Sequence, residues 1–257
     1  MAEQKKEEAP KEESKKGLVV ITGASSGIGA ECAREFHKAG HPILCLARRV
    51  DKMKKDLSDL KDRIEFTKCD VTNFKEFQDA ITAAQDKFGP TECLINNAGV
   101  MLLGDMETQD QKQWSKMIDV NINGVLNGMK IVTANMKKRK AGTIINISSL
   151  AGHKHFDQHT VYCATKYAVR ALSEGLRQEL ATSNVKVCII SPAVVETELL
   201  GHTSSDKIKD GYNDWKKTME LGALLPIDIA NCAMYIYNTP PRCCVREVVI
   251  APTNQVP

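Results

Sequence analysis

The chain has 257 residues, of which 42% are hydrophobic, and its 35 basic and 32 acidic side chains leave a formal net charge of +3. A balance this even excludes the strong basic field that binds nucleic acid or an anionic membrane, so we expect small-molecule partners. No apolar run is long enough to span a bilayer, and the first residues lack the apolar stretch of a secretory signal. We therefore expect a cytoplasmic protein with no membrane span.

Nine cysteines lie at irregular positions, several of them within apolar runs. This usage is typical of buried, reduced thiols rather than of a disulfide framework. Residues 1–16 alternate lysine and glutamate with almost nothing apolar, which predicts a disordered charged tail, with a docking segment as the alternative. The remaining residues, 17–257, are long enough to form one domain with a sizeable core.

A glycine-rich turn at residues 22–29 follows the apolar run 18–21 and precedes a helical pattern. A strand that breaks into such a turn and then starts a helix directs backbone N–H groups and the helix dipole at one anion. Gly23, Gly27 and Gly29 allow a tight turn and a close approach of the backbone to a pyrophosphate. The turn predicts a nucleotide site, and a plain strand-to-helix connection is the alternative.

A second strand is predicted at residues 42–47, and it ends at Arg48 and Arg49. About twenty residues past the glycines, a dinucleotide fold contacts the adenosine ribose. An acidic residue there would accept a hydrogen bond from the 2′-hydroxyl of NAD, whereas an arginine pairs with the 2′-phosphate of NADP. The two arginines therefore favour NADP(H), unless they are ordinary surface residues.

Two further strands are predicted at residues 64–69 and 92–95. Asp70, just past the first of them, could accept a hydrogen bond from the adenine amino group, cap the next helix, or do both. Residues 96–99 form a small-residue turn that would also face the cofactor. Four repeats of strand followed by helix predict an α/β fold, a Rossmann-like doubly wound parallel sheet of about seven strands flanked by helices.

Polar residues then occur at two positions where apolar ones would be expected. A helical pattern over residues 114–132 carries Asn121 on its apolar face, where a buried amide must either brace a bend or hold something in the site. Residues 143–149 predict a fifth strand with serines at its carboxyl end, the edge where open α/β sheets bind ligands. The three histidines of the loop 151–159 have no supporting carboxylate or thiol pattern, so we expect no metal site.

Tyr162 and Lys166 are four residues apart on a helix predicted over residues 160–182, so their side chains share one face. A cation beside a phenol favours phenolate and lowers the pKa of the tyrosine toward that of a working acid or base. Carbonyl reduction requires such a group. A tyrosine and a lysine at this spacing are common on helices, so whether the pair is catalytic depends on the other motifs of the sequence.

The last third of the chain contains a sixth strand at residues 185–190, a helix that opens at Pro226, and a last strand at residues 245–250. Between the first two, residues 198–221 look irregular, and we expect a site-covering lid over residues 198–222, with a purely structural excursion as the alternative. The vicinal cysteines at 243–244 could be a redox pair, but two adjacent buried thiols are the commoner state.

Taken together, these motifs resemble the short-chain dehydrogenase/reductase family. The resemblance covers nearly everything from residue 17 to residue 250 and rests on their order and spacing. Thirteen positions separate Ser149 from Tyr162, as in many members of the family, which selects Ser149 over Ser148. The motifs are residues 22–29, residues 96–99, Asn121, Ser149, residues 162–166 and residues 192–197.

The resemblance implies a catalytic role for four residues. Tyr162 would protonate the carbonyl oxygen as the nicotinamide delivers hydride, and Ser149 would hydrogen-bond that oxygen. Lys166 would hold the nicotinamide ribose and tune Tyr162, while Asn121 would anchor a water of the proton relay. Expected cofactor contacts, besides Tyr162 and Lys166, are Gly23, Ser25, Ser26, Gly27, Ile28, Gly29, Arg48, Arg49, Asp70, Val71, Asn97, Ala98, Gly99, Pro192, Val195 and Thr197.

Substrate contacts are expected at Ser149, His155, Tyr162, Val194 and Trp215. Ala193 departs from the family pattern, which usually has glycine after this proline, and its methyl group would narrow the nicotinamide pocket.

A closer likeness, in residues 162–180, 191–197 and 251–256, is to the branch that contains dehydrogenase/reductase family member 11 and the insect farnesol dehydrogenases. It implies an NADP(H)-dependent oxidoreductase for an apolar ketone or alcohol, such as a ketosteroid or terpenoid. Small 3-hydroxy acids are the alternative substrates, and a non-catalytic NADP(H)-sensing protein is the alternative of another class. The family also implies a homodimer or homotetramer, in which small residues such as Ala164, Ala168 and Ala171 would allow close helix packing.

Overall fold

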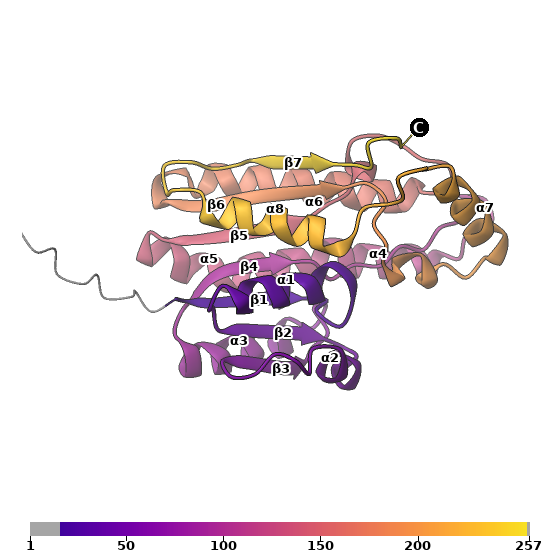
Figure 1. The fold of residues 1–257 in the computed structure, drawn as a ribbon. Helices are drawn as coiled ribbons and strands as arrows, with labels where there is room; N and C mark the ends of the chain where they lie inside the picture. The colour runs from indigo at the N-terminus through magenta and orange to yellow at the C-terminus, as the bar shows by residue number, and fades with distance from the viewer. Residues whose placement is uncertain (1–15, 256–257) are drawn as a thin grey trace, which may run out of the picture.

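Seven parallel strands form one sheet in the computed structural model, which describes residues 16–255. The strand order is β3-β2-β1-β4-β5-β6-β7, so the chain starts in the middle of the sheet, runs to one edge and then crosses to the other (Figure 1). This arrangement confirms the predicted doubly wound parallel sheet. The strands are β1 (Leu18–Thr22), β2 (Ile43–Ala47), β3 (Ile64–Lys68), β4 (Thr91–Asn96), β5 (Gly142–Ile147), β6 (Val185–Pro192) and β7 (Glu247–Ile250).

Helices cover both faces of the sheet. One apolar cluster joins the sheet to α1, α2 and α8, and a second joins it to α3, α5 and α6. Because both faces are covered, the central strands are continuous apolar runs, and every residue of β1, β2 and β6 is buried. The helices are α1 (Gly27–Lys38), α2 (Val50–Asp56), α3 (Phe74–Phe88), α4 (Gln111–Ile118), α5 (Gly124–Arg139), α6 (Thr160–Glu179), α7 (Asp206–Lys217) and α8 (Pro226–Asn238).

Two predicted elements differ in form from the structure. The segment 198–221 is not irregular, because it contains the short 3₁₀ helix Glu198–His202 and then α7, whose first turn is capped by the Ser205 hydroxyl. The predicted helix over residues 114–132 is divided by a π-helical turn, Asp119–Asn123. Such turns insert one residue into a helix and often mark functional positions.

Two smaller expectations are wrong. Asp70 does not cap the helix after β3, because the cap of α3 is Asn73, whose side chain accepts a hydrogen bond from the Glu76 amide. Cys243 and Cys244 are exposed rather than buried, because they lie in the loop before β7. The expected disorder of the tail falls almost entirely on residues 1–15, which lie outside the described part of the chain.

The carboxyl ends of the strands point toward the side of the molecule on which α7 lies (Figure 1). The turns after β1, β2, β4, β5 and β6 therefore meet at one edge, the edge at which parallel sheets bind ligands. Within residues 16–255, no helix combines the length and apolarity needed to cross a membrane.

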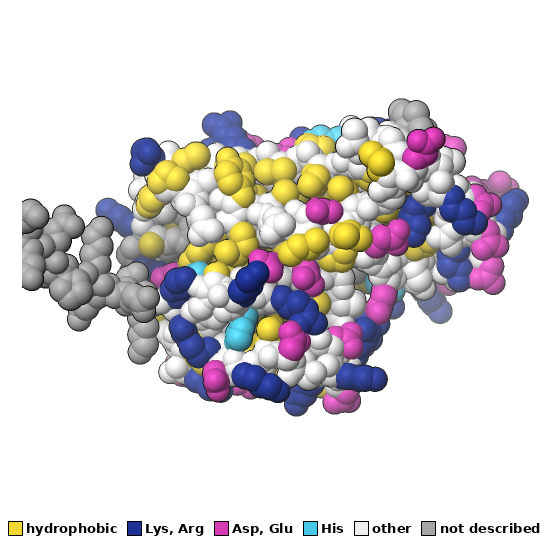
Figure 2. Space-filling view, in the orientation of Figure 1, with side chains coloured by type: hydrophobic (Ala, Val, Ile, Leu, Met, Phe, Trp, Pro, Cys, Tyr) yellow, Lys and Arg dark blue, Asp and Glu magenta, His cyan; other side chains and the backbone are white. Residues whose placement is uncertain are grey.

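Apolar side chains gather on the surface over β7 and α8, as Figure 2 shows when it is compared with Figure 1. Tyr235 on α8 is 63% exposed, and Val249 on the edge strand β7 is 50% exposed. Ala164 and Ala171 lie exposed on α6 beside Tyr167, which is 45% exposed. Isolated exposed apolar residues are ordinary, but a group of them on adjacent elements is typical of a contact surface.

Candidate active site

The glycine turn after β1 is held in place by the turn after β4. The Thr22 hydroxyl accepts hydrogen bonds from the amides of Asn97 and Ala98, both at 3.0 Å. In return, the Asn97 side-chain amide donates to the carbonyl oxygen of Thr22 at 2.9 Å and to that of Gly23 at 3.3 Å. β1 and β4 are neighbours in the sheet, so two turns far apart in the sequence become one rigid unit.

Glycine is required within this turn for two separate reasons. Gly23 has a φ of +67° and Gly27 a φ of +53°, in the left-handed region that favours glycine. At Gly29 a Cβ atom would lie only 2.5 Å from the Asn97 side-chain nitrogen and from the Gly23 carbonyl oxygen. The glycines thus allow α1 to begin within the turn and to pack closely on it, so that the N-terminus of α1 lies at the edge of the sheet.

Arg49 lies beside the same turn. Its guanidinium donates to the hydroxyls of Ser25 and Ser26 at 3.3 and 3.1 Å, and it forms an ion pair with Glu198 at 2.9 Å. Lys52 on α2 also pairs with Glu198, at 3.2 Å. The Arg49 guanidinium therefore lies where the sequence predicted the ribose end of a dinucleotide. Its ion pair with Glu198 connects the segment 198–221 to this end of the site.

Asp70 lies at the same end of the site. Its carboxylate accepts hydrogen bonds from the amide and hydroxyl of Thr72, at 3.0 and 2.8 Å. Burial pushes the pKa of Asp70 up, but the hydrogen bonds from Thr72 and the charge of Arg48 outweigh it and hold the pKa below its usual range. An ionised acceptor is thus available beside the two arginines.

Ser149, Tyr162 and Lys166 are brought together between β5 and α6. Ser149 follows the carboxyl end of β5 in extended conformation and caps a short 3₁₀ helix, its hydroxyl accepting from the Ala151 amide at 3.1 Å. Tyr162 and Lys166 are only 5% and 6% exposed, and the Lys166 ammonium is 5.7 Å from the centre of the Tyr162 ring. The ammonium also donates to the Ile147 carbonyl oxygen at 3.0 Å, which fixes it against β5.

Burial dominates the protonation of this pair. It raises the pKa of Tyr162 above its ordinary value, and the hydrogen bond with the Ser149 hydroxyl only partly opposes it. Burial also lowers the pKa of Lys166 to about 8, because an ammonium group loses its hydration inside the protein. We expected Lys166 to lower the pKa of Tyr162, but burial outweighs any such effect. Tyr162 therefore stays a protonated phenol that can donate its proton.

Asn121 lies in the π-helical turn and is almost fully buried. Its side-chain oxygen accepts from the Val100 amide at 2.8 Å, and its nitrogen donates to the Val100 carbonyl at 2.9 Å and to the Thr165 hydroxyl at 3.1 Å. The amide thus joins the turn after β4 to α6, one residue from Lys166. These hydrogen bonds hold the π-helical turn against two neighbouring elements.

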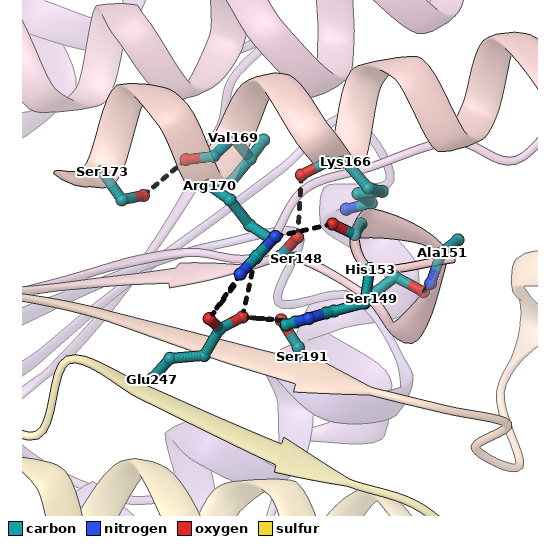
Figure 3. Close-up of polar contacts among 11 residues, drawn as sticks. Ser148, Ser149, Ala151, His153, Lys166, Val169, Arg170, Ser173, Ser191 and Glu247 are labelled. Atoms are coloured by element: carbon teal, nitrogen blue, oxygen red, sulfur yellow. Dashed lines mark hydrogen bonds and ion pairs between the residues drawn. The ribbon is translucent and has the colours of Figure 1, made fainter. Parts of the chain in front are cut away.

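A cluster behind Ser149 was not found by sequence reasoning (Figure 3). Glu247 on β7 accepts from the Ser191 hydroxyl at 2.7 Å, contacts His153 at 2.6 Å, and pairs with Arg170 of α6 at 3.0 Å. Arg170 also donates to the Gly152 carbonyl at 3.0 Å. These contacts hold the segment after Ser149 between α6 and the edge of the sheet. In the sequence, the only sign of this cluster was a carboxylate within the predicted apolar strand 245–250.

Aromatic rings lie beside Tyr162 in the wall of the site. His159 lies 6.1 Å from Tyr162 and 6.2 Å from Tyr212, and Tyr212 lies 5.4 Å from Trp215, between ring centres. Tyr212 and Trp215 come from α7, so the segment 198–221 supplies part of the wall. Burial raises the pKa of Tyr212 to about 12, which keeps its hydroxyl neutral.

One cavity of about 870 Å³ is lined by the glycine turn, the two arginines, Asp70, the group of Ser149, Tyr162 and Lys166, and the aromatic rings, whereas the cluster around Glu247 is not part of its lining. Of the predicted site residues, only Gly29 and Asn121 stand behind its wall instead of in it. Sequence reasoning missed the apolar stretch after β4, of which Val100, Met101 and Leu103 line the cavity. The predicted residues in the lining are Gly23, Ser25, Ser26, Gly27, Ile28, Arg48, Arg49, Asp70, Val71, Asn97, Ala98, Gly99, Ser149, His155, Tyr162, Lys166, Pro192, Val194, Val195, Thr197 and Trp215.

Ala193 also lines the cavity, and its amide donates to the Ile250 carbonyl at 2.8 Å. Over residues 16–255, no three histidine, cysteine or acidic side chains are grouped so as to hold a metal ion.

Comparison with known proteins gives consistent matches over most of the chain. The family model described as short chain dehydrogenase matches residues 17–208. Farnesol dehydrogenase from Aedes aegypti is 36% identical over 249 residues, which cover 93% of this chain and 96% of that protein. An uncharacterised oxidoreductase from Staphylococcus saprophyticus is 43% identical over 241 residues, 93% of this chain and 96% of that one.

Among solved structures, the closed form of a serine dehydrogenase complexed with NADP+ superposes with a TM-score of 0.86 at 28% identity. The match covers 93% of this chain and 96% of that one.

Proposed function

This chain belongs to the short-chain dehydrogenase family and is an oxidoreductase, and on that premise we propose that it interconverts a ketone or aldehyde and an alcohol with NADP(H). The observation that carries the proposal is the meeting of Ser149, Tyr162 and Lys166 in the cavity that also contains the glycine turn. One end of this cavity offers groups for phosphate and ribose, and the other offers a proton donor beside an apolar wall.

The residues present fit a nicotinamide dinucleotide. The glycine turn supplies backbone N–H groups at the start of α1, Asp70 supplies an acceptor, and Arg48 and Arg49 supply cations at the ribose end. When bound, the cofactor supplies or accepts the hydride. The two arginines favour NADP(H) over NAD(H), and the serine dehydrogenase complexed with NADP+ supports this preference by its likeness.

In the mechanism, Tyr162 hands the proton of its phenol to the carbonyl oxygen as the substrate is reduced. Ser149 donates a hydrogen bond to the same oxygen, where negative charge develops. Lys166, held by the Ile147 carbonyl, keeps a positive charge beside the phenol and stabilises the phenolate that is left. Asn121 holds the turn after β4 against α6, and we assign to it the anchoring of a water of the proton relay.

An apolar substrate is the best fit to the wall of the site. Tyr212, Trp215 and Phe156 line it together with the aliphatic side chains of Met101 and Leu103. The likeness to farnesol dehydrogenase supports a terpenoid, and a ketosteroid is the other apolar substrate that we propose. The likeness to serine dehydrogenase favours the alternative, a small 3-hydroxy acid. We assign α7 and the residues around it, 198–222, to a lid over the substrate, in a single domain that acts as a cytoplasmic homo-oligomer.

The test is a spectrophotometric assay of NADPH oxidation with a panel of ketosteroids, terpenoid aldehydes and small 3-keto acids. Tyr162→Phe should lower kcat by about 10²- to 10⁴-fold, because it removes the general acid, while NADPH binding followed by fluorescence stays near the wild-type value. Tyr167→Phe is the matched control, since Tyr167 lies on the exposed side of the same helix. Turnover that survives in Tyr162→Phe would refute the mechanism, and NADPH binding without turnover of any substrate would favour a sensing protein.

A further inference from the structure

Two cysteines that are far apart in the sequence face each other across the last two strands of the sheet. The Sγ atoms of Cys188, in β6, and Cys244, just before β7, are 4.0 Å apart. The register of the two strands brings them together, because Ile189 pairs with Glu247 and the Ile189 amide donates to the Arg246 carbonyl at 3.0 Å. All nine cysteines, this pair included, are free thiols in the structure.

The two thiols differ in how far solvent can reach them. Cys188 is fully buried among the apolar side chains that pack α1 and α8 on the sheet, whereas Cys244 is exposed in the loop between α8 and β7. A reagent from solvent therefore meets Cys244 first. Cys188 then stands behind it as the second thiol, out of reach of the reagent itself.

Charge at the pair favours a thiolate on the exposed member. The hydrogen bond with Cys188 is the largest cause that lowers the pKa of Cys244 below its ordinary value, and the contact with the Val187 carbonyl and the charges of Arg177 and Lys186 act in the same direction against burial. The hydrogen bond with Cys244, together with burial, raises the pKa of Cys188. Thiolate is the reactive form of cysteine, and reactive cysteines lie in partly exposed, electropositive surroundings of this kind.

We propose that Cys244 and Cys188 form a site of reversible oxidation by hydroperoxides, in which Cys244 reacts with the peroxide and Cys188 closes a disulfide. The Cys244 thiolate attacks the O–O bond, so that an S–O bond forms, the O–O bond breaks and the departing hydroxide or alkoxide takes up a proton. Cys188 gives up its proton and attacks the sulfur of the resulting sulfenic acid, and the hydroxyl group leaves as water. Two thiols lose two electrons and one peroxide gains them.

The local structure permits this closure. A disulfide needs the sulfur atoms at about 2.05 Å, so they must approach by roughly 2 Å from their present separation. Cys188 is fixed within β6, but Cys244 lies in the loop between the end of α8 and the start of β7. The proposed closure moves this loop toward β6 and leaves the hydrogen bonds between β6 and β7 in place.

This site differs from the vicinal pair that the sequence suggested. Cys243 is the chemically matched neighbour of Cys244, exposed in the same loop, and its amide donates to the Pro240 carbonyl at 2.8 Å. It therefore provides an internal control for exposure and for general reactivity. The proposal requires that the cross-link select Cys244 over this adjacent thiol.

The experiment treats the whole protein with hydrogen peroxide, blocks the remaining thiols under denaturing conditions, and maps the tryptic peptides by mass spectrometry. Cleavage leaves Cys188 in the peptide 187–207 and both loop cysteines in the peptide 243–246. We expect these two peptides to be joined, with loss of two hydrogens, and to separate after dithiothreitol. Failure of the two peptides to join in the wild-type protein would overturn the proposal.

Variants identify the thiols. Cys243→Ser should keep the cross-link and Cys244→Ser should lose it. In Cys188→Ser the reaction should stop at a sulfenic acid on Cys244, which dimedone traps. If the cross-link survived in Cys244→Ser and were lost in Cys243→Ser, Cys243 would be the reacting thiol and the proposed site would be refuted. The mapping of the wild-type protein tests the join between Cys188 and the loop even where a variant does not fold, and the variants assign the join to Cys244; neither measurement depends on any enzymatic activity.

Discussion

Lys166 carries its ammonium group inside the protein, and a single hydrogen bond to the Ile147 carbonyl replaces part of its lost hydration. Burial moves the pKa values of Lys166 and Tyr162 in opposite directions, down for the lysine and up for the tyrosine. The site therefore holds the acid protonated at neutral pH while the cation beside it is close to losing its proton. Such a pairing costs stability and is typical of functional sites.

The cost of burying Lys166 should depend on pH. Its pKa is about 8 in the folded protein against an ordinary value of 10.5, so below pH 8 both states are protonated and the folded state bears the full cost. Between pH 8 and 10.5 the unfolded chain binds more protons, and the stability of the wild type rises with pH. We expect Lys166→Met, a substitution of similar shape, to relieve this cost at pH 7 and to lose its advantage as the pH rises.

Urea unfolding of the cofactor-free protein and of Lys166→Met measures this effect. Between pH 7 and pH 9.5, the variant should lose about 2 kcal/mol of free energy of unfolding relative to the wild type. The loss of the bond to Ile147 adds a difference that does not change with pH, so the slope isolates the titration of Lys166. A difference in stability that is the same at both pH values would contradict the buried charge.

Among the elements, the segment that begins at Glu198 is coupled to the proposed ribose end of the cofactor site. Glu198 opens the 3₁₀ helix that leads to α7, and its carboxylate pairs with Arg49 and Lys52. If NADP(H) is the cofactor, its 2′-phosphate and Glu198 compete for the same cations. We expect Glu198→Gln to strengthen NADPH binding by about 1.5- to 5-fold, the range of an exposed ion pair, and to leave NADH binding unchanged.

Fluorescence titrations of both cofactors check this coupling, with Glu196→Gln as the control. Glu196, two residues before Glu198, pairs at 2.9 Å with Lys216 in the last turn of α7, outside the cluster around Arg49. Arg48→Asp should move the preference the other way, toward NADH, since it adds a negative charge at the cofactor site. Equal gains for NADPH and NADH in Glu198→Gln would show that Glu198 does not compete with a 2′-phosphate.

Local patterns predicted the elements better than they predicted the contacts between them. The apolar runs, the glycine turn and the four-residue spacing of Tyr162 and Lys166 all express local rules, and the structure has each of them. The helix α7 was missed although Ile208, Tyr212 and Trp215 recur at helical spacing after the Ser205 cap, because charged residues fill most of its other positions. The ion pair of Arg49 with Glu198 and the meeting of Cys188 with Cys244 depend on strand order, which no local pattern encodes.

For the whole molecule, one edge of the sheet and the helix beside it remain partly uncovered. β7 is an edge strand, and an exposed edge beside apolar side chains is a surface on which another chain can pack. Tyr235 on α8 and Val249 on β7 are both exposed and contribute to this surface. We therefore expect the proposed homo-oligomer to use the α8–β7 face.

The double variant Tyr235→Lys, Val249→Lys should reduce the mass of the particle, because two ammonium groups per chain would have to be buried in the contact without partners. Size-exclusion chromatography with light scattering gives the mass, and circular dichroism shows that the variant is folded. Met106→Lys is the control, since Met106 is 52% exposed and lies outside α8 and β7. If the double variant keeps the wild-type mass, or if Met106→Lys lowers it equally, the α8–β7 face is not the contact.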